Sequence, residues 1–245
     1  MKLFASDFDG TLFNKEKLLG ISDSSFDAIR KFQKEGNLFG ICSGRAKDLK
    51  MFELSFKGKL QCDFYILMTG AVILDKNYHV LYEQYIDQQS AKALYERYAA
   101  RGIMNIIAHD EMGKLHYFKP FSQRKFLEDT SYRISGFSLI TLNKQRARGI
   151  AEEMNQQYGE YICAYQNGSI IDVVAAGCSK ASGIQFVKEL YQPDTTYGIG
   201  DSFNDIPLLK EVDGKFTFHN APEEVKKYAD IFVDTVSEAI KKTES

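Results

Sequence analysis

The stretch Lys2–Phe13, which reads KLFASDFDGTLF, decides the fold of this chain. It begins with a short apolar run, Leu3–Ala5, and continues with two aspartates, Asp7 and Asp9, before Gly10 turns the chain. An apolar run of this kind suits a strand that is buried on both faces of a parallel sheet, with the aspartates at its carboxyl end. Ligands bind at that end of the strands in open α/β sheets. We therefore expect Asp7 and Asp9 to lie at a binding site.

The two carboxylates need a partner, because acids two residues apart repel one another unless a cation, a proton or hydrogen bonds compensate their charge. A cation that prefers oxygen ligands, such as Mg²⁺, fits this requirement. Asp-Phe-Asp-Gly on its own is also ordinary turn chemistry. A calcium loop of the EF-hand type is excluded, because its sixth and twelfth places need Gly and Glu. Counted from Asp7, those places hold Leu12 and Leu18.

The composition is that of an ordinary globular protein and excludes several classes of function. The 245 residues are 44% hydrophobic and 26% charged, which allows one large domain or two smaller ones. The 31 basic and 33 acidic residues give a net charge of −2 without a basic stripe, so a nucleic-acid partner is not expected. No signal peptide is evident, and no apolar run approaches the ~20 residues of a membrane span. The sequence does not indicate the oligomeric state.

The cysteines and histidines show no metal or disulfide pattern. The four cysteines lack Cys-x-x-Cys pairing, and the four histidines lack the spacing of zinc ligands. Reduced thiols and a cytoplasmic location are the natural expectation. The cysteines are Cys42, Cys62, Cys163 and Cys178.

Apolar periodicity predicts an alternating α/β part that is interrupted by an α+β part. The opening βαβαβ pattern implies a parallel sheet, and the same alternation resumes at Lys180. Between these parts, hairpins alternate with helices, and Asn167-Gly168 is a strong hairpin signal. The expected α/β elements are strands at 3–5, 38–42, 64–68, 196–199, 216–218 and 231–233, and helices at 22–35, 45–57, 181–190 and from about 236. The interrupting part includes strands at 104–108, 115–118 and 137–142, and helices at 90–101, 122–129 and 144–158.

We therefore predict a Rossmann-like core that is discontinuous in sequence. It comprises residues 1–79 and 179–245, and an inserted α+β domain comprises residues 80–178. The two linkers are expected near 75–80 and 176–179, where the turn around Asn77 and Gly177 can absorb backbone rotation.

A second acidic loop, Gly200–Asp205 (GDSFND), also follows a predicted strand. If its strand lies beside the first one, Asp201 and Asp205 converge with Asp7 and Asp9 at one sheet edge. The alternative is that Asp205 caps the next helix and Asp201 faces water. Convergence without compensation is costly, and a divalent cation would resolve it and supply a Lewis acid.

Ser43 and Gly44 also follow a strand end, and we expect them at the start of a helix. A hydroxyl and exposed backbone amides there suit a phosphoryl oxygen. Lys180 begins the helix that restores the core after the insert, although one lysine alone is more often a surface charge.

Taken together, four motifs resemble those of the haloacid-dehalogenase-like (HAD) hydrolases in order and in strand context. They are Asp7–Thr11 (DFDGT), Ser43–Arg45 (SGR), Lys180 and Gly200–Asp205. The insert lies between the second and third motifs, as in the Cof-type branch with its large α/β cap. The tail around 219–226 is similar to that branch as well. One departure is Thr69-Gly70-Ala71, where the family usually has Asn-Gly-Ala.

The resemblance implies a Mg²⁺-dependent phosphatase that acts on small phosphorylated metabolites, such as sugar phosphates. In this family pattern Asp7 forms an aspartyl-phosphate, and Asp9 acts as acid and base. The implied metal site consists of Asp7, the backbone carbonyl of Asp9, and Asp201, with Asn204 or Asp205 holding metal waters or orienting Lys180.

The resemblance also implies a phosphoryl site, in which Ser43 and Lys180 bind the phosphoryl oxygens beside Gly44. Arg45 could reach the leaving group or the closed cap, and the alternative for it is a surface salt bridge.

Three other functions remain open from the sequence. A phosphomutase or phosphotransferase could pass the phosphoryl group from Asp7 to a sugar instead of water. A response-regulator receiver has similar strand-end acids, but it is much shorter and lacks a cap. A non-catalytic phosphate-binding regulator is the third, although every chemical position holds a competent residue.

Overall fold

The computed structural model describes residues 1–13, 20–47, 49–98, 101, 103–118 and 132–244. The helix expected over 122–129 lies outside these residues. Among the described helices, none combines the length and apolar character that crossing a bilayer would require.

The larger of two sheets has eight strands in the order β13-β12-β11-β1-β2-β3-β4-β5. Its strands are β1 (Lys2–Ser6), β2 (Leu38–Cys42), β3 (Phe64–Leu67), β4 (Val72–Asp75), β5 (Val80–Glu83), β11 (Thr195–Ile199), β12 (Gly214–Phe218) and β13 (Ile231–Val233). Neighbouring strands from β13 to β3 are parallel, and the hairpin of β4 and β5 adds two antiparallel strands at one edge. The expected parallel core sheet is therefore present, with β1 near its centre.

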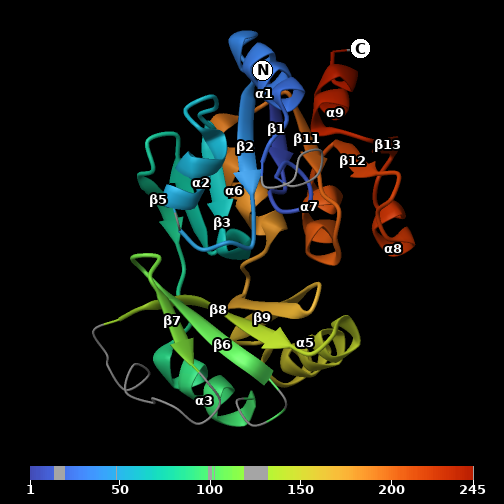
Figure 1. Ribbon diagram of the computed structural model, residues 1–245. Helices are drawn as coiled ribbons and strands as arrows, with labels where there is room; N and C mark the ends of the chain where they lie inside the picture. Colours follow the sequence, from blue (N-terminus) through green and yellow to red (C-terminus); the bar gives the residue numbers. More distant parts are fainter. Residues whose placement is uncertain (14–19, 48, 99–100, 102, 119–131, 245) are drawn as a thin grey trace.

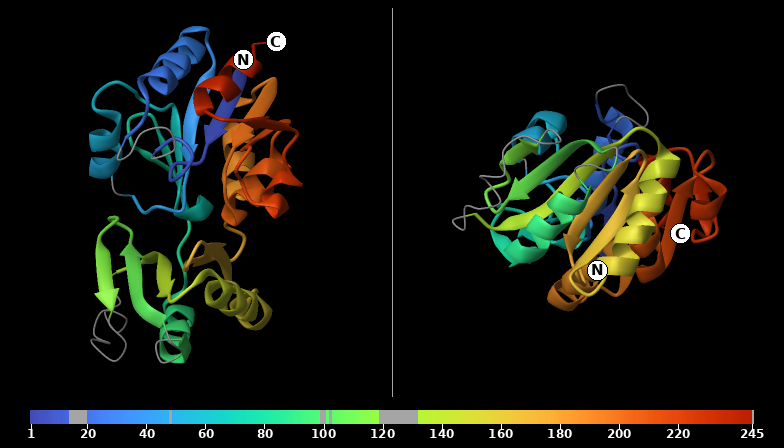
Figure 2. Two further views of the ribbon diagram at one scale, coloured as in Figure 1. Left: turned by 45° about the vertical axis from the view of Figure 1, so that its right-hand side comes forward. Right: turned by 90° about the horizontal axis from the view of Figure 1, so that it is seen from below.

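Helices cover both faces of this sheet, as the alternation of side chains along β1 requires. Phe4 packs on one face with residues of α1, α2 and α9, whereas Leu3 and Ala5 pack on the other with residues of α6 and α7. Figures 1 and 2 show the two helical layers with the sheet between them. These helices are α1 (Asp23–Lys34), α2 (Leu49–Phe56), α6 (Lys180–Tyr191), α7 (Ile206–Glu211) and α9 (Val236–Lys242). The short α8 (Glu223–Lys226) follows β12.

The smaller sheet has five strands in the order β7-β6-β8-β10-β9, and all its pairs are antiparallel. Its strands are β6 (Ile103–Asp110), β7 (Leu115–Phe118), β8 (Ile134–Thr141), β9 (Ile162–Asn167) and β10 (Ile170–Ala175). Helices α3 (Gln88–Tyr98) and α5 (Lys144–Tyr158) lie on the side of this sheet that faces away from the larger sheet. We call the part from α3 to β10 the cap, and the larger sheet with its helices the core.

Two segments connect the core to the cap, and they lie side by side. Gln84 Nε2 donates a hydrogen bond to the carbonyl of Ala176 at 2.9 Å, and Gln84 N donates to the carbonyl of Ala71 at 2.8 Å. The first connection comes later than the sequence suggested, because β5 pairs with β4 and extends the core sheet to Glu83. The turn around Asn77 is accordingly a hairpin turn within the core.

A left-handed turn at Met68–Gly70 follows β3 and braces the core near its carboxyl edge. Its three residues have φ angles of 46°, 50° and 92°. Met68 N donates to the carbonyl of Arg45 at 2.8 Å, and Thr69 N donates to the carbonyl of Ser43 at 3.1 Å. A Cβ on Gly70 would lie 2.0 Å from the carbonyl oxygen of Ser179, so only glycine fits there. The turn therefore fixes the loop after β2 and the start of α6 at once.

Thr69 stores backbone strain in this turn, because a β-branched residue in the left-handed region is an outlier that costs about 1 kcal/mol or more. We expect Thr69→Asn to raise the free energy of unfolding by about 1 kcal/mol, since Asn tolerates this conformation. Denaturant unfolding of the two proteins measures the difference.

Thr217→Asn is the matched control. Thr217 is equally buried, but it lies in β12 without a positive φ, so the same substitution there should be destabilising. Equal losses of stability in both variants would contradict strain at Thr69.

Candidate active site

The ends of β1 and β11 bring the two acidic loops together. The strands pair in parallel with Ser6 opposite Ile199, so the residues that follow them emerge at the same edge. Asp7 N donates to the carbonyl of Ile199 at 2.9 Å, which continues the pairing by one residue. The expected convergence of Asp7 with Asp201 and Asp205 is present: one carboxylate oxygen from each lies within 4.8 Å of the others.

A buried ammonium group joins two of these carboxylates. Lys180 Nζ lies 2.6 Å from Asp7 Oδ1 and 2.5 Å from Asp205 Oδ1, and the lysine side chain is fully buried. Lys180 is the first residue of α6, which Ser179 begins with a capping box. Because Gly70 packs against Ser179, the turn at Met68–Gly70 fixes the place from which Lys180 extends.

The charges of this cluster do not balance. Burial raises the pKa of Asp7 well above its usual value, and Asp205 and Asp201 raise it further, while Lys180 opposes them. Burial lowers the pKa of the Lys180 ammonium, but the charges of Asp205 and Asp7 raise it more, so it lies well above the usual value. One ammonium faces three carboxylates, so the site needs a proton or a cation. The hard oxygen donors of this set fit a divalent metal ion.

Asp201 and Asp205 are held by different partners. Thr11 Oγ1 donates to Asp201 Oδ1 at 2.8 Å. Asp205 Oδ2 accepts from Asp201 N at 3.0 Å and from Ser202 N at 2.9 Å, while its other oxygen binds Lys180. Asp205 is thus committed to orienting the lysine and its own loop, and Asn204 is hydrogen-bonded to Ser202 through Oδ1.

Asp9 turns away from this cluster and pairs with Arg45. Arg45 Nε and Nη2 lie 2.6 Å from the two oxygens of Asp9, and both side chains are about two-fifths exposed. Gly10 makes this turn possible with a φ of 78°, and a Cβ there would lie 3.1 Å from Asp201 Oδ2. The sequence left open whether Arg45 reaches the leaving group or the cap, or forms a salt bridge. Its described contact with Asp9 is a salt bridge.

Ser43 and Gly44 lie in a loop rather than at a helix start, because α2 begins only at Leu49. Ser43 N donates to the carbonyl of Ile66 at 2.8 Å, and Ser43 Oγ accepts from Arg45 N at 3.1 Å. The Ser43 hydroxyl is therefore held at the edge of the sheet by β3 and by its own turn.

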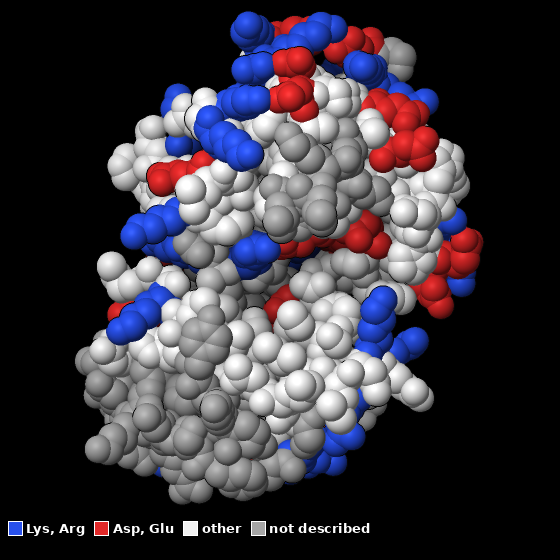
Figure 3. All heavy atoms as spheres, in the orientation of Figure 1, with Lys and Arg blue, Asp and Glu red and all other residues white. Residues whose placement is uncertain are grey.

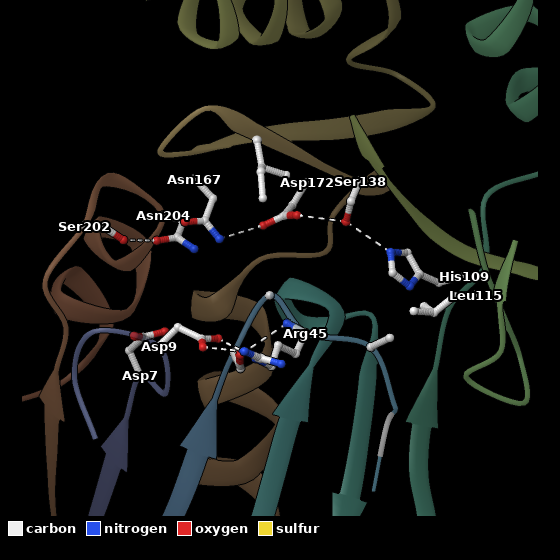
Figure 4. A pocket seen from close by; sticks show the side chains of 14 residues that line it. Asp7, Asp9, Arg45, His109, Leu115, Ser138, Asn167, Asp172, Ser202 and Asn204 are labelled. Atoms are coloured by element: carbon white, nitrogen blue, oxygen red, sulfur yellow. Dashed lines mark hydrogen bonds and ion pairs between the residues drawn. The ribbon is translucent and has the colours of Figure 1, made fainter. Parts of the chain in front are cut away.

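A cavity of about 420 Å³ separates this edge from the cap. Figure 3 shows the hollow between core and cap, with acidic and basic side chains exposed along it. The core residues that line the cavity are Asp7, Asp9, Ser43, Gly44, Arg45, Ala46, Ser202 and Asn204, and the cap residues are His109, Leu115, Ser138, Asn167, Ile170 and Asp172. Figure 4 shows both sets facing one another.

Strand alternation explains which cap residues face the core. In β10, Ile171 and Val173 pack in the apolar core with residues of α3 and α5, so Asp172 between them points to the opposite face. Asp172 pairs with Ser138 across β8, and Ser138 Oγ donates to its Oδ1 at 3.2 Å. Asn167 Nδ2 donates to the other oxygen at 3.2 Å, and His109 Nε2 lies 3.0 Å from Ser138 Oγ.

These cap residues were not predicted from the sequence. Asp172 was the detectable one, because a carboxylate in the middle of the apolar run Ile170–Ala175 is unusual for a buried strand. His109 and Ser138 give no such signal, since their neighbourhood depends on the pairing of β6 with β8 and of β8 with β10.

The model of the haloacid dehalogenase-like hydrolases matches residues 4–240. A 5-amino-6-(5-phospho-D-ribitylamino)uracil phosphatase of Bacillus subtilis is 27% identical over 238 residues, which cover 96% of this chain and 90% of the relative. A phosphoglycolate phosphatase of Thermoplasma acidophilum is 24% identical over 246 residues, which cover 96% of this chain and 92% of the relative.

Solved structures show the same fold. A subclass IIB sugar phosphatase of the HAD superfamily superposes with a TM-score of 0.78 at 22% identity, covering 100% of this chain and 99% of that one. A protein of Streptococcus mutans superposes with a TM-score of 0.83 at 19% identity, covering 99% of this chain and 98% of that one. The expected family and fold class are thus confirmed. The chain belongs to the haloacid dehalogenase-like hydrolases and is a phosphatase-type enzyme of that family, with a parallel-sheet core and an inserted α+β cap.

Proposed function

We propose that this protein is a Mg²⁺-dependent phosphatase that hydrolyses small phosphorylated metabolites through an aspartyl-phosphate on Asp7. One observation carries the proposal: the Asp7 carboxylate ends a central strand, contacts the buried Lys180 ammonium at 2.6 Å, and lines a cavity. A carboxylate placed in this way can attack phosphorus, because the adjacent ammonium attracts the phosphoryl oxygens and positions them for in-line transfer.

The metal would be held by Asp7 and Asp201, with Asp205 close by and with the backbone carbonyl of Asp9 as the family pattern implies. When bound, such a cation supplies Lewis-acid stabilisation of charge on the phosphoryl oxygens. The site requires a cation because three carboxylates face one ammonium group, that of Lys180. Mg²⁺ is the ion we propose, because it is commonly bound by few carboxylates together with substrate phosphates.

Asp9 is the proposed acid and base. Its pair with Arg45 is about two-fifths exposed, so solvent screens the attraction, and we propose that the carboxylate separates from Arg45 when substrate binds. Once released, it can give a proton to the leaving oxygen and then take one from the attacking water. Arg45 would then hold the leaving group or a phosphoryl oxygen.

We propose that Ser43 and Lys180 bind the phosphoryl oxygens. Ser43 Oγ already accepts a hydrogen bond from Arg45 N, so its own O–H is the group that can donate. Lys180 uses two of its three N–H donors on Asp7 and Asp205, which leaves one for the phosphoryl group. Because Gly44 has no side chain, the part of the cavity beside Ser43 stays open.

The size of the cavity supports a small leaving group, since about 420 Å³ lies within the usual range of small-molecule sites. The ribityl and glycolate phosphates in the names of the relatives support the same class. We also propose that residues 1–83 and 179–245 form the catalytic core and that the cap recognises the leaving group. The cytoplasmic location stays a prediction that the four free thiols support.

Asp7→Asn should lower kcat by roughly 10⁴-fold or more, because a carboxamide cannot replace the nucleophile. The measurement is phosphate release from a panel of phosphorylated metabolites with Mg²⁺ and without any added acceptor. Circular dichroism should show that the variant is folded. Unchanged turnover in Asp7→Asn would contradict the assignment, and release that requires an added sugar would indicate a phosphotransferase.

Asp201→Ala should raise the Mg²⁺ concentration at half-maximal rate by about 10-fold or more, since even residues behind the ligands contribute that much. Asp230→Ala is the control, because Asp230 is an exposed aspartate that precedes β13, away from the cluster. Titrations of both variants with Mg²⁺ at constant ionic strength give the comparison. Identical titration curves for the two variants would exclude Asp201 as a ligand.

A further inference from the structure

The cap meets the core at a second place, away from the two connecting segments, at the 43–47 loop that follows β2. A Cβ on Gly113, in the turn between β6 and β7, would lie 2.6 Å from the carbonyl oxygen of Lys47 and 3.1 Å from its Cβ. A Cβ on Gly44 would lie 2.7 Å from Asp172 Oδ2 in β10. In Figures 1 and 2 the β6–β7 turn points from the cap toward the core. Two cap elements thus approach this loop, and in each contact one partner is a glycine.

The β6–β7 turn is held in shape by its own hydrogen bonds. Asp110 is buried, and its Oδ1 accepts from Met112 N at 3.0 Å and from Lys114 N at 2.8 Å. Its Oδ2 lies 2.8 Å from His116 Nε2, and its carbonyl accepts from Gly113 N at 3.0 Å. A side chain added at Gly113 would therefore separate the cap from the 43–47 loop before it reshaped the turn.

Lys47 is fixed by a separate contact near the first connection between core and cap. Lys47 Nζ lies 3.4 Å from Glu83 Oε1, and both side chains are largely buried. The Tyr85 hydroxyl donates to the other oxygen of Glu83, and the Arg133 guanidinium carbon lies 4.4 Å from the centroid of the Tyr85 ring. Arg133 N donates to Glu111 Oε2 at 2.8 Å, at the β6–β7 turn. A chain of contacts thus leads from Lys47 through the connecting segment back to the turn that approaches it.

The loop that the cap contacts carries groups of the proposed phosphoryl site. The core holds its first part, because Thr69 N donates to the carbonyl of Ser43 at 3.1 Å and Met68 N donates to the carbonyl of Arg45 at 2.8 Å. The cap contact at Lys47 lies two residues beyond the second of these bonds. We therefore expect the position of the loop after Arg45 to depend on the cap.

We propose that the β6–β7 turn is a positioning element for the reaction: Gly113 packs against Lys47 when the cap is closed, and this contact holds the loop that presents Arg45 to the cavity. Gly113 is a positioning residue, since it is not among the described residues that line the cavity. The effect on turnover rests on the proposed phosphatase function, whereas the contact itself does not. A displaced cap must close before substrate is bound productively, so displacement weakens apparent binding.

Gly113→Ala tests the contact, and Gly168→Ala is the matched control. Both glycines lie in hairpin turns of the cap sheet, with φ angles of 76° and 60°, so alanine carries a similar backbone penalty at both positions. A Cβ on Gly168 would have no heavy atom of the described residues within 4 Å. The two variants should therefore melt at similar temperatures and differ in the contact with Lys47.

Hydrogen–deuterium exchange of the backbone amides of residues 44–47 measures this contact without any substrate. Exchange should be about 10-fold faster in Gly113→Ala than in the wild-type protein, because forcing an extra methyl group into a close contact shifts an equilibrium by roughly that factor or more. Gly168→Ala should exchange at the wild-type rate. Equal exchange rates in the two variants would overturn the proposal, whether or not the protein is a phosphatase.

Steady-state kinetics separate positioning from a loss of folded protein. Gly113→Ala should raise the KM of a hydrolysed phosphate ester about 10-fold and leave kcat within about 2-fold, because saturating substrate draws the cap back to the closed state. A lower kcat at unchanged KM would indicate a merely structural defect and would overturn the positioning role. If no phosphate ester is hydrolysed, the phosphatase proposal fails, whereas the exchange rates still decide whether Gly113 holds the loop.

Discussion

The contact of the buried Lys180 ammonium with Asp7 and Asp205 is the interaction on which the rest of the structure depends. Removing one member of such a buried group leaves an unpaired charge and typically costs about 3–5 kcal/mol. The fold fixes all three residues from different places: Asp7 from β1, Asp205 from the loop after β11, and Lys180 from the start of α6. The strained turn at Met68–Gly70 belongs to this arrangement, because it holds the start of α6.

The same cluster links stability to function. One ammonium does not neutralise three carboxylates, so the site favours whatever brings positive charge, and we propose that Mg²⁺ does so during phosphoryl transfer. Across the cavity, the cap keeps Asp172 buried, which raises the pKa of its carboxyl to about 6. Core and cap thus each bury acidic groups facing the cavity, and in our account the Asp7 carboxylate of the core attacks the phosphorus while Ser43 and Lys180 bind the phosphoryl oxygens.

Much of the core followed from the sequence because its signals are local. The strand-end aspartates and Gly10 mark positions that depend on a few neighbouring residues. What failed depends on pairing between distant segments. The sequence could not show that the hairpin of β4 and β5 joins the core sheet beside β3, nor that His109 and Ser138 meet beside Asp172. It also placed a helix directly after Arg45, where Ser43 and Thr69 instead brace an irregular loop.

The central claim is that Asp7 itself carries the phosphoryl group, and a rapid acid quench tests it most directly. The protein is mixed with Mg²⁺ and a ³²P-labelled substrate ester, quenched in acid within one turnover, and digested for peptide mapping. Our account predicts a hydroxylamine-sensitive label on the peptide that contains Asp7, formed before free phosphate and absent in Asp7→Asn. Free phosphate that appears without any labelled protein, or a label on another residue, would contradict it.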